Sequence, residues 1–119
     1  MALTSRNEHA EQVMLVQWYR LQYPKQIKCL WAIPNGGVRN IGTAIKLKKE
    51  GVVPGVSDLF LMMPNSTKHG LFLEMKAKSG KLTTDQKEFI NLAQSMGYEA
   101  KVAYSYEEGK EIIKKYLQE

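Results

Sequence analysis

Two short apolar runs separated by a turn-rich segment constrain the fold of this chain more than any other feature. The runs cover residues 58–63 and 71–77, and residues 64–70 between them contain Pro, Asn, Ser and Gly. This pattern predicts a β-hairpin. With the segments on either side, the predicted order is α-β-α-β-β-α-β-α, which indicates an α/β fold with a mixed β-sheet flanked by helices.

The segments around the hairpin are marked by helix-capping patterns and glycines. Ser5 with Glu8, and later Thr83 with Gln86, form capping-box patterns, and Ser105 begins a third. The expected helices cover residues 5–23, 41–50, 83–97 and a last segment that starts after residue 105. Further strands are expected over residues 27–33 and 99–104.

The first expected helix carries an apolar stripe, and helical spacing places five residues on it. They are Ala10, Val13, Met14, Trp18 and Leu21. Glu11 lies at the border of this stripe, about 20° from Trp18 around the helix axis. We therefore expect Glu11 at the edge of the buried face of the helix.

Length, charge and cysteine content limit the class of protein. The chain has 119 residues, 44% of them hydrophobic, and residues 1–119 are expected to form a single domain. Seventeen Lys and Arg against twelve Asp and Glu give a net charge of +5, which favours a polyanionic partner. Cys29 is the only cysteine, so an internal disulfide or a cysteine-rich zinc site is excluded.

The expected compartment is the cytoplasm. A single cysteine suits a reducing environment. The chain has no apolar run near the ~20 residues of a membrane span, and its first residues lack the apolar segment of a signal peptide. We therefore expect a soluble protein that is not exported and has no membrane partner.

Ionisable residues inside the apolar hairpin indicate a site. Glu74 and Lys76 are two residues apart, so they share one face of the sheet. If the hairpin is symmetric about residue 66 or 67, Asp58 lies opposite residues 74–76. Two carboxylates suit a hard cation such as Mg²⁺, and a lysine beside them suits phosphoryl chemistry. The alternative interpretation is a salt-bridge cluster at the edge of the sheet.

Several motifs, taken in their order along the chain, resemble those of a nuclease family. They are Ile33-Pro-Asn-Gly-Gly-Val-Arg39, the 42–51 segment, Pro54-Gly-Val-Ser-Asp58, Glu74-Met-Lys76 and Gly80-Lys-Leu-Thr-Thr-Asp-Gln86, preceded by a helix with Glu11. Together they resemble the PD-(D/E)XK nucleases, in particular the VRR-NUC branch found in phage and in DNA-repair nucleases. The resemblance runs from about residue 9 to residue 104. It implies a restriction-endonuclease-like fold.

The resemblance implies metal-dependent hydrolysis of phosphodiester bonds in DNA, with Mg²⁺ as cofactor and Mn²⁺ as a substitute. Asp58 and Glu74 would be metal ligands and Lys76 the catalytic lysine. Gln86 would support the site from the start of a helix, and its alternative role is that of capping-box partner. Glu11 matches the first-helix glutamate that touches the metal or its water shell, and its alternative is a solvated helix position.

Basic residues and a glycine turn are candidate DNA contacts. Backbone N–H groups of Asn35, Gly36 and Gly37, with the side chain of Arg39, can bind a phosphate; the alternative is a tight turn and a solvated arginine. Residues 39–81 hold eight Lys or Arg and three Asp or Glu, so the positive charge is concentrated near the predicted site. The candidate lysines are Lys46, Lys48, Lys49, Lys68, Lys78 and Lys81.

The remaining unusual residues are expected to be structural. His9 and His69 lack metal-ligand spacing, and Cys29 is expected in the core of a strand. Trp18 and Trp31 are able to stack on bases, although buried packing is the default for each.

The expected function is a structure-selective DNA nuclease that acts on branched or Holliday-junction-like DNA as a homodimer, in the host cytoplasm if a phage encodes it. Two alternatives stay open. The first is a DNA-binding module without catalysis, and the second is a restriction-type endonuclease of the same fold that reads a base sequence.

Overall fold

The computed structural model of the chain describes residues 7–34 and 41–119. The elements in chain order are α1 (Glu8–Gln22), the 3₁₀ helix η1 (Pro24–Cys29), β1 (Leu30–Ala32), α2 (Ile41–Lys49), β2 (Leu59–Leu61), β3 (Leu71–Met75), α3 (Thr84–Ser95), β4 (Glu99–Ala103) and α4 (Tyr106–Gln118). The four strands form one sheet in the order β1-β2-β3-β4, in which the first two pairs are antiparallel and the third is parallel. The predicted mixed sheet flanked by helices is confirmed.

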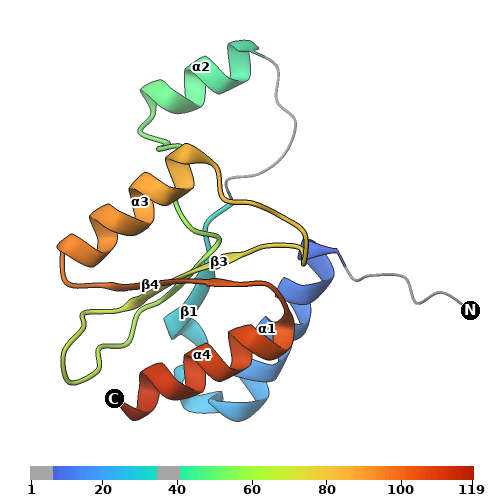
Figure 1. Cartoon of the computed structure of the whole chain (residues 1–119), viewed down its shortest axis with the longest axis vertical. Coiled ribbons are helices and arrows are strands. Elements are labelled where there is room, and N and C mark those ends of the chain that lie inside the picture. The colour runs from blue at the N-terminus through green and yellow to red at the C-terminus, as the bar shows by residue number, and fades with distance from the viewer. Residues whose placement is uncertain (1–6, 35–40) are drawn as a thin grey trace, which may run out of the picture.

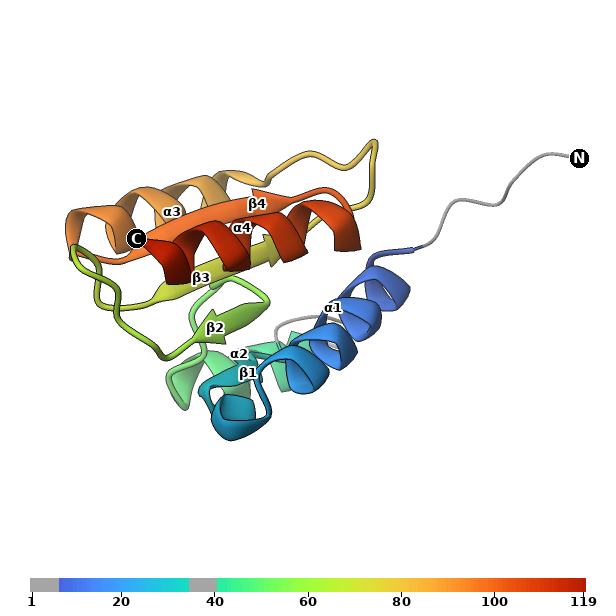
Figure 2. The same ribbon diagram turned by 90° about the horizontal axis from the view of Figure 1, so that it is seen from below.

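Helices cover the two faces of the sheet differently. In Figure 1, α3 lies on one side of the strands, whereas α1 and α4 lie together on the other. Figure 2, seen from below, shows α1 and α4 as separate helices that approach each other where both begin. Helix α2 stands beyond the start of α3, and none of its residues is buried.

The main core lies between the sheet and the pair α1 and α4. Its sheet side includes Leu59, Leu61, Leu71, Leu73 and Met75, all at most 1% exposed. The helices contribute side chains that are at most 2% exposed, namely Leu15, Tyr19, Ile113 and Tyr116. Because side chains alternate along a strand, the residues between these leucines face α3 instead.

The hairpin is confirmed with its predicted register. Leu59 pairs with Leu73, Phe60 with Phe72 and Leu61 with Leu71, so the hairpin is symmetric about residue 66. The strands are shorter than the apolar runs that predicted them. The burial of alternate residues fixes this register, since a slip by one residue would turn every leucine away from the core.

Two of the predicted caps are present in the described part of the chain. Thr83 and Gln86 form the complete capping box of α3, and the Ser105 side chain accepts the Glu108 N–H at the start of α4. Helix α1 begins at Glu8, where the Asn7 side chain accepts the Ala10 N–H. Ser5, the predicted cap, lies outside the described residues.

The predicted apolar stripe of α1 is correct only in part, because Ala10, Met14 and Trp18 are half-buried but none of its five residues is fully buried. The buried residues of the helix are Glu11, Leu15 and Tyr19, whereas Leu21 is 86% exposed. Apolar residues occur around most of this helix, so helical periodicity alone does not select the buried face. Contact with α4 selects it, and Glu11 lies within the buried face rather than at its border.

The strand predicted over residues 27–33 is also shorter than expected. Residues up to Cys29 form the 3₁₀ helix η1, which begins at Pro24. The hydroxyl group of Tyr19 donates a 2.8 Å hydrogen bond to the Gln26 carbonyl and holds this turn against α1. Cys29 is therefore half-buried at the end of a helical turn and not in a strand.

No helix in the described ranges, 7–34 and 41–119, is long and apolar enough to cross a membrane.

Candidate active site

Asp58 and Glu74 face each other at the open end of the hairpin. The pairing of Leu59 with Leu73 places Asp58 opposite Glu74, on the sheet face that α3 covers. Oδ2 of Asp58 accepts a 2.7 Å hydrogen bond from the Met75 N–H, and the Asp58 carbonyl accepts one of 2.8 Å from the Ile33 N–H. Contacts to both neighbouring strands therefore hold Asp58 in place.

Glu74 is a buried carboxyl group with a strongly shifted pKa. Its side chain is 3% exposed. Burial, then a hydrogen bond with Asp58 and the charge of Asp58, raise the pKa of Glu74 to about 8, although the charge of Lys76 acts in the opposite direction. Because this pKa lies above neutral pH, the protonated form of Glu74 predominates at pH 7.

Gln86 joins the start of α3 to this carboxyl pair. Its Oε1 accepts a 2.9 Å hydrogen bond from the Thr83 N–H, and its own N–H donates to Thr83 Oγ1 over 3.1 Å. Its Nε2 lies 3.4 Å from Oε2 of Glu74 and donates to it. Gln86 therefore caps α3 and also contacts the Glu74 carboxyl group, and its role in a catalytic site stays a prediction.

Lys76 lies two residues beyond Glu74 on the same face of the sheet. Its backbone N–H pairs with the Ala103 carbonyl, which extends the pairing of β3 with β4 by one residue. Its ammonium group is near enough to lower the pKa of Glu74. Within the described part of the chain it forms no direct ion pair with Asp58 or Glu74, so the arrangement differs from a closed salt-bridge cluster.

Two glutamates in the first turn of α1, Glu8 and Glu11, act at different places near the site. Oε1 of Glu11 accepts a 2.7 Å hydrogen bond from the Tyr106 N–H at the start of α4, so a metal contact by Glu11 would use its other oxygen. The charge of Glu8 raises the pKa of Glu74. Sequence reasoning treated Glu8 only as a capping residue, yet its place one turn before Glu11 was a signal that both share a helix face.

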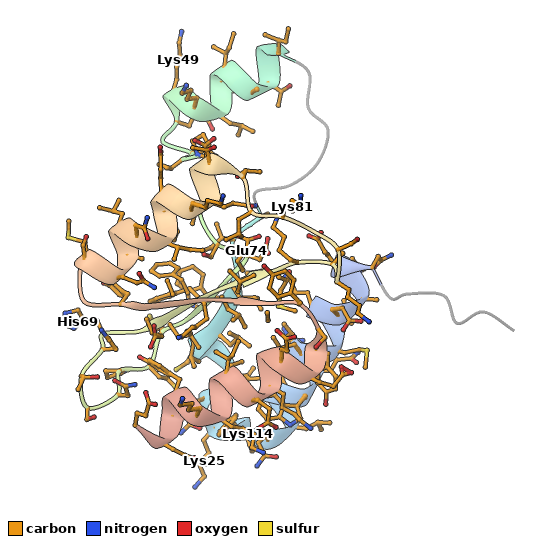
Figure 3. The ribbon with its side chains drawn as sticks, in the orientation of Figure 1. Lys25, Lys49, His69, Glu74, Lys81 and Lys114 are labelled. Atoms are coloured by element: carbon orange, nitrogen blue, oxygen red, sulfur yellow. The ribbon has the colours of Figure 1, made fainter. Side chains whose placement is uncertain are left out.

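The candidate lysines are spread over three segments of the chain. Lys78 and Lys81 are exposed in the loop between β3 and α3, and Figure 3 shows Lys81 above the buried Glu74. The exposed lysines of α2 stand beyond the start of α3, and they are Lys46, Lys48 and Lys49. Lys68 lies in the hairpin loop, at the opposite end of β2 and β3 from the carboxyl pair, which argues against a role beside the site.

The predicted phosphate-binding turn is outside the described residues. Its members are Asn35, Gly36, Gly37 and Arg39.

The carboxyl pair fits an oxygen-preferring divalent cation. Among residues 7–34 and 41–119, no three His, Cys, Asp or Glu side chains are grouped to hold a metal ion. Asp58 and Glu74 are nevertheless close enough to share a proton, and a divalent cation neutralises the same excess of negative charge. Mg²⁺ is often bound by one or two carboxylates with water in its remaining positions.

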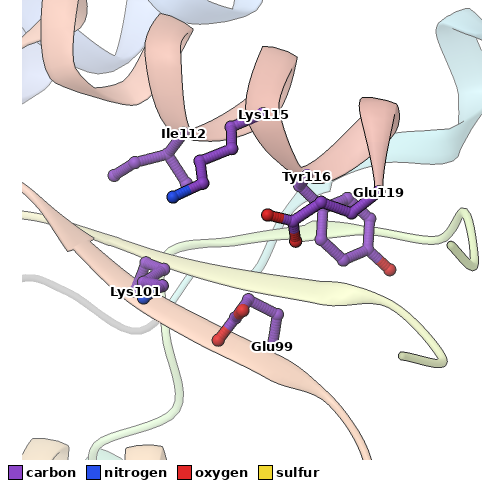
Figure 4. Close-up of a pocket in the computed structure, with 6 residues that line it drawn as sticks. All are labelled: Glu99, Lys101, Ile112, Lys115, Tyr116 and Glu119. Carbon is purple, nitrogen blue, oxygen red and sulfur yellow. The ribbon is translucent and has the colours of Figure 1, made fainter. Parts of the chain in front are cut away.

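A hollow of about 210 Å³ lies between β4 and α4 (Figure 4). Its lining residues carry two positive and two negative charges, and they are Glu99, Lys101, Ile112, Lys115, Tyr116 and Glu119. Glu99 and Lys101 pair with Leu71 and Leu73, so they face α4. The hollow is therefore on the other face of the sheet from Glu74 and is separate from the carboxyl pair.

The hairpin thus brings together an opposed acidic pair, a lysine two residues further on and a glutamine at a helix start. The VRR-NUC domain profile matches residues 6–107, and the chain belongs to this family. A solved structure described as a VRR_NUC domain protein superposes with a TM-score of 0.85 and 26% sequence identity, over 97% of this chain and 91% of that chain. No curated protein matches.

Family membership sets the general chemistry of the protein. VRR-NUC domains are nuclease-type domains with DNA as their substrate, and the family is generally metal-dependent.

Proposed function

We propose that this chain is a Mg²⁺-dependent deoxyribonuclease, able to use Mn²⁺ instead, that cuts branched or Holliday-junction-like DNA. Residues 1–119 would form one nuclease domain. The observation that supports this most is the opposition of Asp58 and Glu74, with Lys76 beside them on the same face of the sheet. A DNA-binding module without catalysis has no comparable use for a buried carboxyl pair, whereas a restriction-type endonuclease of the same fold would use it in the same way and is separated only by its choice of DNA.

Each residue of the site has a role that follows from its contacts. Asp58 and Glu74 would hold the cation, which lowers the pKa of a water molecule and offsets negative charge on a phosphoryl oxygen. Glu74 would have to lose its proton for both carboxylates to hold the cation. Lys76 places a positive charge beside the reacting phosphate, where charge increases in the transition state.

Gln86 and Glu11 support the carboxyl pair from two helices. The Nε2 of Gln86 would fix the orientation of the Glu74 side chain, because the Oε1 of the same amide is held by the capping box of α3. In this proposal the second oxygen of Glu11 reaches the water shell of the cation, while its first oxygen holds the start of α4.

The basic residues would bind the DNA backbone without reading its sequence. Phosphate contacts give affinity that decreases as salt concentration rises. The contacting lysines are proposed to be Lys46, Lys48, Lys49, Lys78 and Lys81, together with the predicted phosphate contacts Asn35, Gly36, Gly37 and Arg39. Contacts to phosphates fix the position of the protein on DNA but carry no sequence information.

We further propose that the active form is a homodimer. One protomer of 119 residues covers too little DNA to make two symmetric cuts in a four-way junction. Two copies related by a two-fold axis present two sites. Analytical ultracentrifugation that finds a monomer, both free and bound to a four-way junction, would contradict this proposal.

Cleavage of labelled DNA tests the proposed function. Four-way junction, flap and linear duplex substrates are incubated with wild type, Asp58→Asn and Glu88→Gln, each in Mg²⁺, Mn²⁺ or EDTA. Glu88 is an exposed carboxylate of α3 and serves as the matched control. We expect metal-dependent cleavage by wild type and Glu88→Gln, loss of cleavage in Asp58→Asn, and fastest cleavage of branched DNA.

The same assay separates the alternatives. DNA binding without cleavage in any metal would overturn the catalytic proposal and leave a DNA-binding module. Cleavage of linear duplex at one base sequence would indicate a restriction-type enzyme instead.

A further inference from the structure

A row of aromatic side chains crosses the sheet on the same face as the carboxyl pair. Trp31 of β1 pairs with Phe60 of β2, which pairs in turn with Phe72 of β3. The ring centroids of Trp31 and Phe60 are 5.3 Å apart, and those of Phe60 and Phe72 are 4.5 Å apart. The three rings therefore form one continuous contact.

Exposure increases along this row toward the edge of the sheet. Ala100 of β4, next to Phe72, is 2% exposed under α3. Phe72 is half-buried and meets Phe89 of α3 edge to face. Trp31 is 44% exposed at the outer end of the row. Helix α3 thus covers one end of the row and leaves the indole of Trp31 open to solvent.

The default of buried packing is therefore wrong for Trp31. Its ring meets Phe60 at an interplanar angle of 69°, so the indole is supported along one side. Trp18, the other tryptophan, is half-buried against the Tyr23 ring on the opposite side of the sheet. An exposed indole that is held by a neighbouring ring offers a fixed apolar surface to a ligand.

Strand geometry places Trp31 close to the carboxyl pair. Trp31 is opposite Phe60, and Phe60 is two residues from Asp58 on the same face of the sheet. Two residues of a strand span about 7 Å and neighbouring strands are about 5 Å apart, so the backbones of Trp31 and Asp58 are about 8 Å apart. A nucleotide whose phosphate lies at Asp58 has its base within reach of the indole.

We propose that Trp31 stacks on an unpaired base of the substrate, next to the phosphate that the carboxyl pair binds. This inference rests on the proposed nuclease function and adds the feature of DNA that the site selects. Bases inside a duplex are already stacked on both sides, so only a base at a branch, flap or end has a face to offer. Stacking on an aromatic ring tolerates every base, which agrees with binding that does not read sequence.

Binding in EDTA tests this proposal without cleavage. Anisotropy of labelled oligonucleotides is measured with fully paired duplex, flap and single-stranded DNA, for wild type, Trp31→Ala, Trp31→Phe and the control Trp18→Phe. We expect Trp31→Ala to weaken binding of flap and single-stranded DNA about tenfold while leaving duplex binding unchanged. Trp31→Phe retains a ring and is expected to restore most of the affinity.

Fluorescence gives a second measurement that needs no change at Trp31. In Trp18→Phe the only indole is Trp31, and we expect single-stranded DNA to quench its emission more than duplex does. Equal effects of Trp31→Ala on all three DNAs, or absence of quenching, would overturn the proposal. A shift of Trp31→Ala from dimer to monomer, with binding of unpaired DNA intact, would instead assign Trp31 to a protein contact.

The two proposals fail in distinguishable ways. If the chain binds DNA without cleaving it, Trp31→Ala still loses affinity for unpaired DNA while Asp58→Asn keeps it. If the chain is a nuclease but Trp31 has no role, cleavage depends on Asp58, and both binding and quenching are insensitive to Trp31.

Discussion

Replacement of Glu74 by Gln is expected to remove part of the pH dependence of the free energy of unfolding. The pKa of Glu74 is raised from 4.5 to about 8 in the folded protein, so folding favours its protonated form. Such a group contributes stability that is complete below pH 4.5 and is lost as pH rises toward 8. With about 1.4 kcal/mol for each pKa unit, the loss between pH 5 and pH 7 amounts to about 2–3 kcal/mol.

Glu74→Gln keeps the shape of the side chain but does not ionise. Urea unfolding in EDTA at pH 5, 6 and 7 measures the free energy of unfolding of wild type, Glu74→Gln and Glu88→Gln. We expect Glu74→Gln to gain about 2–3 kcal/mol over wild type as pH rises from 5 to 7, whereas Glu88→Gln follows wild type. Parallel curves for wild type and Glu74→Gln would refute the buried, protonated state of Glu74.

Three further predictions concern the surroundings of the pair. Gln86→Ala and Thr83→Ala both remove the capping box, and each is expected to lower the free energy of unfolding in urea by about 1 kcal/mol. Only Gln86→Ala should also lower the cleavage rate, by about tenfold, because it alone removes the hydrogen bond to Glu74. Both Gly55 and Gly51 have positive φ, but only a Cβ at Gly55 would meet the backbone of α3. Gly55→Ala should therefore lower the free energy of unfolding by about 1–3 kcal/mol more than Gly51→Ala, and equal losses would contradict this packing. Calorimetry should show Mg²⁺ affinity that increases from pH 6 to pH 8, since the proton of Glu74 must leave; constant affinity would contradict proton release.

The hairpin was predictable because two independent features agree on it. Alternation of leucines with other residues sets which side chains face the core, and the turn-rich segment sets the centre of symmetry. The resulting register, with Leu59 opposite Leu73, brings Asp58 to Glu74 as expected. The capping box of α3 was likewise local, since Thr83 and Gln86 are three residues apart.

The face of α1 was not predictable from periodicity. The helix carries apolar side chains on several sides, and a buried glutamate breaks the pattern that would identify the core face. Glu11 is buried because the start of α4 has backbone N–H groups that need an acceptor, and its carboxylate binds the Tyr106 N–H. That contact joins residues 95 positions apart, so the α1 sequence by itself contains no sign of it.

Trp31 shows the same limit at the edge of the sheet. An indole in a short apolar segment is usually buried, and only the arrangement of α3 over β4 leaves this one open. Its exposure is a property of the assembled sheet.

The carboxyl pair and the core lie on opposite faces of the same strand, β3, so the register of this strand determines the position of both. Leu73 and Met75 face the core, whereas Glu74 between them faces α3. A shift of one residue would bury Glu74 among leucines and place Leu73 opposite Asp58. The free energy that the leucines gain on burial therefore also holds Glu74 against Asp58, even though this pairing raises the pKa of Glu74 and destabilises its charged form. Substitutions of the leucines should thus reduce stability and activity together, whereas substitution of Glu74 should separate the two.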